Sequence, residues 1–345
     1  MSGDLEAAVL SSSDYDEWNT FVAGCPEGSI YSDSRYLAVL SRATGGTFRI
    51  AAVRRDGQLL GGIALYIEKM GGLRVVSPRY LLYFNGFVVS PTLPGSPATQ
   101  TSTLLHFHSA MLRYLDKQKF DRIYIKTRPP ETDFRMFFRH GWSAAPSYSY
   151  VVPLDDLDLL WSRTDRNLRR LVKRCEASGL RLSKDVDFDS FWRLHIQTHE
   201  RKGSPVYLPR AAFEKYIRDL HSLSLCQLYQ VRRPDNRTVA TLLVLANEHE
   251  VCHTVAAASD VEYLNAGVSA FVRWMSFKDL ASQGYAANDL TDASLNSVTR
   301  FKSQLGGELA LAIEIQQAEN AIVKWRFDIA DLRARIGARL RRFIN

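Results

Sequence analysis

The sequence predicts an α/β (α+β) protein made of two copies of one unit, each a mixed central sheet flanked by helices, with a further helix at the C-terminus. Two observations support this prediction. The chain has 345 residues, which is too long for one ordinary core, since domains usually hold about 100–200 residues. The chain also repeats one order of elements: a hairpin, a helix, a strand, a short helix closed by glycine, and a final strand.

The two predicted hairpins have the same design. Residues 48–68 form two strand-like runs around Asp56-Gly57, a dipeptide typical of tight hairpin turns. Residues 226–250 follow the same plan, and the tripeptide Val-Arg-Arg at 53–55 recurs at 231–233 ahead of the second turn.

The closing segments of the two units also correspond. In the first unit a strand at 121–128 precedes a short helix and a final strand, and in the second unit the strand lies near 286–292. Gly141 and Gly306 then occupy equivalent positions after the short helices, where glycine commonly ends a helix in the left-handed conformation. We therefore expect the first unit at residues 1–153 and the second at 154–318.

Helical segments precede the second hairpin and end the chain. Residues 157–178 form a basic amphipathic segment that ends before Gly179, with Arg166, Arg170 and Lys173 among its cations. Residues 319–345 carry one apolar stripe with arginines on the other faces, which predicts a helix packed on the body. The alternative for that helix is contact with an anionic membrane surface.

Composition limits the class of protein. The net charge of +7 and a pI near 9.2 suit phosphate-bearing partners, although a surplus of this size also occurs in proteins that bind none. No apolar run approaches the ~20 residues of a membrane span, and the N-terminus lacks the features of a signal peptide. The four cysteines match no zinc or redox spacing, so we expect a cytoplasmic protein, peripheral to the inner membrane face if the last helix binds lipid.

The motif with most chemical content lies at residues 288–309, NDLTDASLNSVTRFKSQLGGEL. It combines an aspartate-containing strand, a loop, a Phe-Lys pair and two glycines before the last strand. In this order, and together with the duplicated unit, it resembles Fem-type (FemAB-like) peptidyltransferases, which belong to the GNAT superfamily of acyltransferases with tandem GNAT-like units. The resemblance covers residues 18–316.

The resemblance implies a catalytic role for Lys302. N-acyl transfer develops an oxyanion as an amine attacks a thioester or ester carbonyl, and a fixed cation near that oxygen stabilises the charge. Phe301 would pack the helix and direct the lysine, and Gly306 and Gly307 would allow a sharp turn into the last strand. The alternative is a solvated lysine that interacts favourably with the helix C-terminus.

Asp289 and Asp292 are the candidate proton acceptors. Both lie where a strand meets a loop, and a carboxylate there can accept the proton of the attacking amine. Asp292 can instead cap the following helix.

A donor site is expected at the start of the helix near residue 266. Asn265, Gly267, Val268 and Ser269 keep small residues there, which suits a phosphate cradle at a helix N-terminus, with Arg300 as a further anion-binding residue. The full glycine-rich signature of acetyl-CoA-binding GNAT enzymes is absent. Acyl-CoA and aminoacyl-tRNA both stay open as donors.

The remaining candidates are residues expected to bind substrate, and they come from both units: Arg201, Lys202, Phe301, Tyr83, Asn85, Arg128 and Asp133. Compensation of a helix dipole explains Arg201 and Lys202 equally well. His195 and His199 are four residues apart, but no third ligand is evident, so no metal is expected. His253 lies in an apolar strand and is expected to be a core residue with satisfied hydrogen bonds.

Together with the residues described above, the resemblance implies a bacterial N-acyltransferase. An acyl or aminoacyl group would pass from the donor to an amine of a cell-envelope precursor, of the peptidoglycan or exopolysaccharide kind. The alternatives are a catalytically inactive binding module with the same scaffold, and an RNA- or membrane-associated protein that uses its basic helices. The sequence leaves the acceptor amine, the acyl group and the oligomeric state open.

Overall fold

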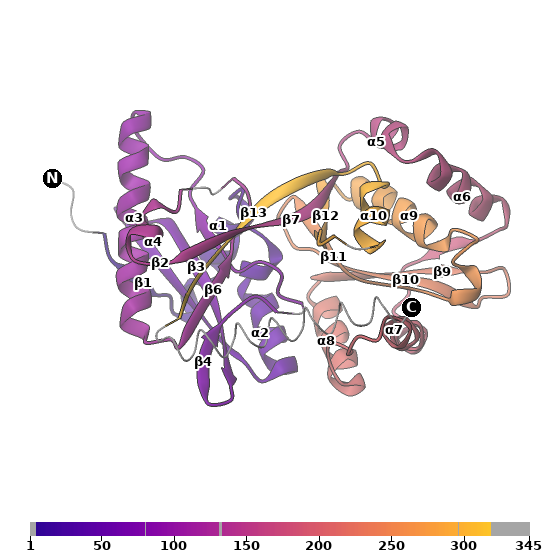
Figure 1. Cartoon of the computed structure of the whole chain (residues 1–345), viewed down its shortest axis with the longest axis horizontal. Helices are drawn as coiled ribbons and strands as arrows, with labels where there is room; N and C mark the ends of the chain where they lie inside the picture. Colours follow the sequence, from indigo (N-terminus) through magenta and orange to yellow (C-terminus); the bar gives the residue numbers. More distant parts are fainter. Residues whose placement is uncertain (1–4, 80, 131–132, 296, 319–345) are drawn as a thin grey trace.

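The computed structural model describes residues 5–79, 81–130, 133–295 and 297–318 (Figure 1). The helix expected at 319–345 lies outside the described residues. Among the helices that the structure describes, none combines the length and apolar character needed to cross a bilayer.

The first half of the chain, up to Pro153, alternates strands and helices. Its elements are β1 (Ala7–Val9), η1 (Ser12–Asp14), α1 (Tyr15–Ala23), η2 (Ile30–Ser32), α2 (Ser34–Thr44), β2 (Thr47–Arg55), β3 (Gln58–Met70), β4 (Leu73–Val76), β5 (Phe87–Val89), α3 (Pro97–Gln118), β6 (Arg122–Lys126), α4 (Arg135–Arg139) and β7 (Ser143–Pro153).

The second half repeats the order after two additional helices, Leu157–Arg163 and Arg166–Ala177. Its elements are α5 (Leu157–Arg163), α6 (Arg166–Ala177), β8 (Arg181–Ser183), α7 (Phe188–Lys202), α8 (Arg210–Ser222), β9 (Cys226–Arg232), β10 (Thr238–Leu245), β11 (Val251–Ser259), η3 (Val261–Tyr263), α9 (Val268–Ser282), β12 (Ala287–Asp292), α10 (Ser297–Ser303) and β13 (Glu308–Ala318).

The strands of both halves form one continuous 13-stranded sheet instead of two separate sheets. Its order is β1-β2-β3-β4-β6-β13-β7-β12-β11-β10-β9-β8, with β5 beside β3. The pairs β4–β6 and β11–β12 are parallel, while their neighbours in the sheet are antiparallel. The predicted mixed α/β class is therefore confirmed, and the two sheets are joined edge to edge.

The join is made by an exchange of last strands. β13, which ends the second unit in sequence, pairs with β6 of the first, and β7, which ends the first unit, pairs with β12 of the second. β7 and β13 pair with each other from Val151–Glu308 to Ser143–Gln316. Figure 1 shows these two long strands crossing from one half of the molecule to the other. The unit boundary near Pro153 stays a prediction, because the units share strands in space.

Both hairpin turns use residues that tolerate positive φ. Asp56 (φ 52°) and Gly57 (φ 80°) form the two-residue turn between β2 and β3, as the Asp-Gly signal predicts. In the second hairpin Asn236 (φ 68°) supplies the left-handed residue. Gly141 and Gly306, expected after the short helices, also have positive φ, at 79° and 82°.

The segment at 157–178 is two helices and not one. The first ends at Arg163. Asp165 caps the second, because its carboxylate accepts the backbone N–H groups of Asn167 (2.8 Å) and Leu168 (3.3 Å). The break turns α6 back over the sheet, where Leu168 and Val172 are buried against the second unit's core.

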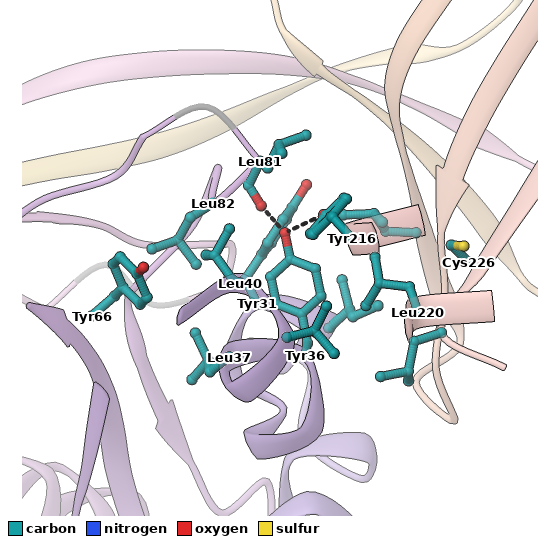
Figure 2. Close-up of a cluster of buried hydrophobic side chains, with 14 of the residues drawn as sticks. Tyr31, Tyr36, Leu37, Leu40, Tyr66, Leu81, Leu82, Tyr216, Leu220 and Cys226 are labelled. Atoms are coloured by element: carbon teal, nitrogen blue, oxygen red, sulfur yellow. Dashed lines mark hydrogen bonds between the residues drawn. The ribbon is translucent and has the colours of Figure 1, made fainter. Parts of the chain in front are cut away.

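One buried cluster belongs to both halves. Tyr36 of α2 and Tyr216 of α8 are fully buried, and their hydroxyls lie 3.0 Å apart. Figure 2 shows the Tyr36 hydroxyl between Tyr216 and the carbonyl of Leu81, to which it donates. Because α2 and α8 pack on each other in this cluster, the halves are joined through side chains as well as through the sheet.

Ile315 tests the contribution of the exchanged strand to stability. It lies on β13 but is fully buried in the first unit's core. We expect Ile315→Ala to lower the free energy of unfolding by about 2–5 kcal/mol, because a buried side chain is lost and a cavity is left. Urea denaturation followed by circular dichroism measures the change.

The matched control is Leu311→Ala on the same strand, where the side chain is 46% exposed. It should change the free energy of unfolding by only about 0.5 kcal/mol. Equal losses for the two variants would show that β13 does not complete the first unit's core.

Candidate functional site

The site begins where two parallel strands separate. β11 and β12 pair at Val251–Ala287, Cys252–Asn288 and His253–Asp289. Beyond this last pair, residues 254–257 of β11 and 290–292 of β12 line two sides of a cavity of about 290 Å³. We call it the cationic cavity, after the charged side chains Lys202, Arg273 and Lys302 that complete its lining.

A kink in β12 directs Asp292 to this cavity. Thr291 has a φ of 58°, which is uncommon for a β-branched residue, and the pairing of β12 with β7 is irregular between Asp289 and Asp292. The Asp289 carboxylate accepts the Thr291 backbone N–H at 2.7 Å and so stabilises the kink. As a result Asp289 and Asp292, three residues apart, face different surroundings.

Lys302 points into the cavity from α10. Its side chain is buried, at 7% exposure, and Nζ donates to the backbone carbonyl of Asp292 at 2.5 Å. Burial, reinforced by the charge of Arg273, lowers the pKa of Lys302 to about 8, while Asp292 and Asp289 act in the opposite direction. The ammonium group therefore lies in a largely desolvated position inside the cavity.

Arg273 of α9 is a cavity residue that sequence reasoning missed. It is 6% exposed, its Nη1 has no hydrogen-bond partner within the described structure, and its guanidinium lies 5.8 Å from the centre of the Phe301 ring. Burial alone lowers the pKa of Arg273 to about 10. A sequence signal existed, since Arg273 interrupts an apolar helix in the stretch VSAFVRWMSF.

Helix α7 provides a further wall of the cavity. His195 is buried, burial lowers its pKa to about 3, and Nε2 has no partner among the described residues. The imidazole of His199 lies 4.3 Å from that of His195, centre to centre, and its Nδ1 is 3.1 Å from Ser204 Oγ. Lys202 reaches the cavity from the end of α7, and partial burial and the charge of Arg201 lower its pKa.

No metal site accompanies these histidines. Within the described ranges there is no cluster of three or more His, Cys, Asp or Glu side chains that could hold an ion. The same part of the chain contains the four cysteines, all buried and free of disulfides.

A second hollow adjoins the cationic cavity and lies between the two units. This inter-unit groove measures about 560 Å³, and its lining includes Tyr83, Lys126, Tyr207, Asp292 and Glu314. Tyr207 and Asp292 line both spaces, so the groove opens toward Lys302. Lys126 Nζ lies 3.8 Å from the centre of the Tyr83 ring and 3.5 Å from the Glu314 carboxylate.

Asp289 does not share the cavity of Lys302. It is 1% exposed and lines a separate hollow of about 430 Å³ together with Arg128 and Ser149. Burial raises its pKa, although Arg128 opposes the shift. His253 Nδ1 lies 3.9 Å from the Asp289 carboxylate, and neither ring nitrogen of His253 has a hydrogen-bond partner in the described structure. His253 is buried as expected, but the expectation that its hydrogen bonds are satisfied is wrong for the described structure.

Three of the expected substrate residues of the first unit have local partners instead. Asn85 binds β6, because its side chain donates to the carbonyl of Tyr124 (2.9 Å) and accepts the N–H of Lys126 (2.8 Å). Buried Arg128 donates to the carbonyls of Pro26 and Gly28. Asp133 binds the Arg135 guanidinium at 2.6 Å.

Two expected anion-binding residues lie outside the cavities described above. Arg201 and Arg300 are exposed, and neither lines the cationic cavity, the inter-unit groove or the hollow at Asp289. By contrast Phe301 packs on the second unit's core, in keeping with its expected role of orienting α10.

The start of α9 is covered by α6. Gly267 and Val268 are buried, and a Cβ on Gly267 would come within 2.5 Å of the Leu171 side chain. Arg174 donates to the carbonyl of Asn265 at 2.5 Å, and the hydroxyls of Ser259 and Ser269 lie 2.9 Å apart. The segment 265–269 thus does not form an open phosphate cradle in this structure.

Comparison with known proteins agrees with this architecture. Residues 162–303 match the family model of the acetyltransferase (GNAT) domain. No curated protein sequence matches the chain.

Three solved structures share the fold at low sequence identity. FemX has a TM-score of 0.71 and 16% identity, covering 91% of this chain and 98% of its own. The C-terminal domain of a proposed lysylphosphatidylglycerol synthetase from Agrobacterium fabrum has a TM-score of 0.60 and 13% identity, covering 93% and 97%. A tandem GNAT protein from the clavulanic acid biosynthesis pathway has 0.52 and 10%, covering 92% and 99%.

The matched family model identifies an acetyltransferase (GNAT) domain at residues 162–303 of this chain. The described chain as a whole shares its fold with FemX and with the tandem GNAT protein.

The shifted pKa of Lys302 predicts a pH-dependent stability. Because its pKa falls from 10.5 to about 8 on folding, the unfolded chain binds more protons between these pH values, and folding becomes more favourable as the pH rises through them. Relative to Lys302→Met, the wild type should gain about 3 kcal/mol of unfolding free energy from about pH 8 to about pH 10.5.

Urea unfolding of both variants across this pH range measures the gain. Lys278→Met, at an exposed position of α9, controls for the loss of one positive charge. A constant difference between wild type and Lys302→Met would show that Lys302 titrates alike in the folded and unfolded chains.

Proposed function

We propose that this protein transfers an acyl or aminoacyl group from an activated donor to an amine of a cell-envelope or polysaccharide precursor. The observation that carries the proposal is the position of Lys302, whose buried ammonium lies in a cavity that opens to a groove between the two units. Such a cation can stabilise the negative charge that develops on a carbonyl oxygen.

The reaction follows from the arrangement of Lys302 and Asp292. The acceptor amine attacks the donor's carbonyl carbon, a C–N bond forms, and the carbonyl oxygen takes up negative charge beside Lys302. The Asp292 carboxylate accepts the proton that the amine nitrogen loses. The C–O or C–S bond to the donor then breaks, the carbonyl re-forms, and the leaving oxygen or sulfur takes up a proton.

Asp292 is the better candidate base on geometry. It lines both the cationic cavity and the inter-unit groove, whereas Asp289 lines neither. Asp289 instead supports the kink that directs Asp292, through its bond to the Thr291 N–H. We therefore assign Asp289 a positioning role.

We place the acceptor amine at the end of the inter-unit groove that Asp292 lines. Arg79 and Lys126 also line the groove, and Lys126 pairs with Glu314 and lies over the Tyr83 ring. Asp292 is therefore the acidic residue that an ammonium group would meet before it loses its proton. Tyr83 is the one first-unit candidate that lines this groove, so the acceptor would enter between the units.

For the donor, the structure favours aminoacyl-tRNA over acyl-CoA. The α9 start, where a pyrophosphate would be bound, is covered by α6. The outer face of α6 exposes Arg166, Arg170 and Lys173, which can contact the phosphates of a nucleic acid. One structural neighbour is the C-terminal domain of a proposed lysylphosphatidylglycerol synthetase, a name that is also consistent with aminoacyl transfer.

We place the reaction on the cytoplasmic side of the membrane, which suits the four free, buried cysteines. The catalytically inactive binding module and the RNA- or membrane-binding protein are the competing functions. Neither requires a desolvated lysine in a cavity that adjoins the inter-unit groove. Turnover separates both from the proposed enzyme.

Lys302→Ala should reduce kcat/KM about 10²–10³-fold, the usual loss when one oxyanion donor is removed. The measurement is a donor screen with charged tRNA and with acyl-CoA thioesters, each with an amine-bearing precursor peptide as acceptor. Transfer from tRNA should weaken as salt is raised.

The exposed Lys278→Ala is the matched control and should keep the wild-type rate. Unchanged turnover in Lys302→Ala would remove the proposed mechanism. Wild-type protein that binds a donor without turnover would favour the inactive binding module.

A further inference from the structure

We propose that the cationic cavity binds an oxyanion group of a substrate, a carboxylate or a phosphate, and that Arg273 is the main residue that binds this anion. The inference concerns the same cavity as the proposed transfer and deepens it by naming a chemical feature of the substrate. It assigns to Arg273 a binding role, separate from the oxyanion stabilisation assigned to Lys302.

The charges around the cavity are unbalanced. Lys202, Arg273 and Lys302 line it, and Asp292 is the one acidic residue that the described part of the chain adds to the lining. The Asp292 side chain lies at the junction with the inter-unit groove, where its carboxylate accepts the Ser294 backbone N–H at 3.1 Å. Arg273 forms no ion pair with a carboxylate of the described residues, so its charge has no acidic partner in that part of the chain.

An arginine in this state is costly unless an anion joins it. A charged group that is removed from water loses much of its hydration free energy and is normally paired when buried. Arg273 is 6% exposed and its Nη1 has no hydrogen-bond partner in the described structure. A planar guanidinium binds carboxylate or phosphate through two parallel hydrogen bonds, which gives the missing partner its chemistry.

Two further unpaired polar atoms belong to the same lining. His195 Nε2 and Thr198 Oγ1, both on α7, have no hydrogen-bond partner among the described residues. The two residues are 2% and 5% exposed, and both line the cavity with Arg273. Buried polar atoms are almost always hydrogen-bonded. Three unpaired polar atoms around one cavity therefore indicate that the cavity binds a polar group.

Lys302 is distinguished from this set by its own hydrogen bond. Its Nζ is held by the carbonyl of Asp292, at the side that opens to the groove. Arg273, His195 and Thr198 can therefore hold a fixed part of the substrate while Lys302 lies toward the reacting carbonyl. A substrate that lacks the anion would leave Arg273 buried and unpaired, and it would be discriminated against.

The test is isothermal titration of the full chain with inorganic phosphate and, separately, with succinate, each at millimolar concentration. The wild type should bind at least one of the two. Arg273→Met should weaken that binding about tenfold or more, the usual effect of losing a charged hydrogen-bond partner. Arg166→Met, at an exposed position of α6, controls for net charge and should bind as the wild type does.

Thermal unfolding without ligand separates binding from a structural role. Because methionine removes an unpaired buried charge at similar volume, Arg273→Met should have a Tm equal to or above that of the wild type. Thr198→Val, which keeps the shape of the side chain and removes only the hydroxyl, should weaken anion binding several-fold at an unchanged Tm. It provides the test if Arg273→Met fails to fold.

Binding of phosphate alone would identify a phosphate group of the substrate, and binding of succinate alone a carboxylate. Binding of neither anion by the wild type, or equal binding by the wild type and both variants, would overturn the proposal. Since no acyl donor or acceptor is present in this titration, its outcome is independent of whether the protein catalyses the proposed transfer.

Discussion

The pairing of β7 with β13 is the constraint on which the rest of the structure depends. Each strand ends one unit in sequence, and each pairs with a strand of the other unit. β7 lies beside β12, and β13 lies beside β6. Neither half therefore has a complete sheet by itself, and Ile315 of β13 completes the core of the first. The packing of Tyr36 on Tyr216 reinforces the join on one face of the sheet. A duplicated unit thereby becomes a single body with a groove between its halves.

The same pairing sets the position of the site. β12 lies between β7 and β11, and it is held by β7 where it kinks at Thr291. The kink lets the parallel strands part, and the opening is filled by side chains from α7, α9 and α10. Because β13 crosses into the first unit, Glu314 reaches the groove beside Lys126 and Tyr83. The two cavities that meet at Asp292 are thus consequences of the exchanged strands.

Electrostatics give these cavities their chemical character. Lys302 and Arg273 are both buried, and the charge of Arg273 disfavours that of Lys302, whereas Asp292 and Asp289 favour it. Burial alone disfavours the charge of Arg273. In water the repulsion between two such cations would be screened. In a desolvated site the excess of positive charge has a stronger effect. The arrangement lowers the stability of the free protein and favours an anion, whether a bound group or the charge that develops during acyl transfer. Asp289 illustrates the opposite case, a carboxylate that burial drives toward its neutral form.

Local features of the fold and part of the site follow from the sequence alone. Asp56-Gly57 determines a hairpin turn, and Gly141 and Gly306 supply left-handed residues after short helices. Lys302, selected by the Phe-Lys pair ahead of two glycines, lines the cationic cavity. These signals are local, because they depend on backbone conformations that neighbouring residues favour. The tertiary structure alone decided the strand exchange, the covering of Gly267 by Leu171, and the meeting of Arg273 with His195 and Thr198. Those features arise between residues distant in the chain, where burial and charge depend on packing that no short stretch encodes.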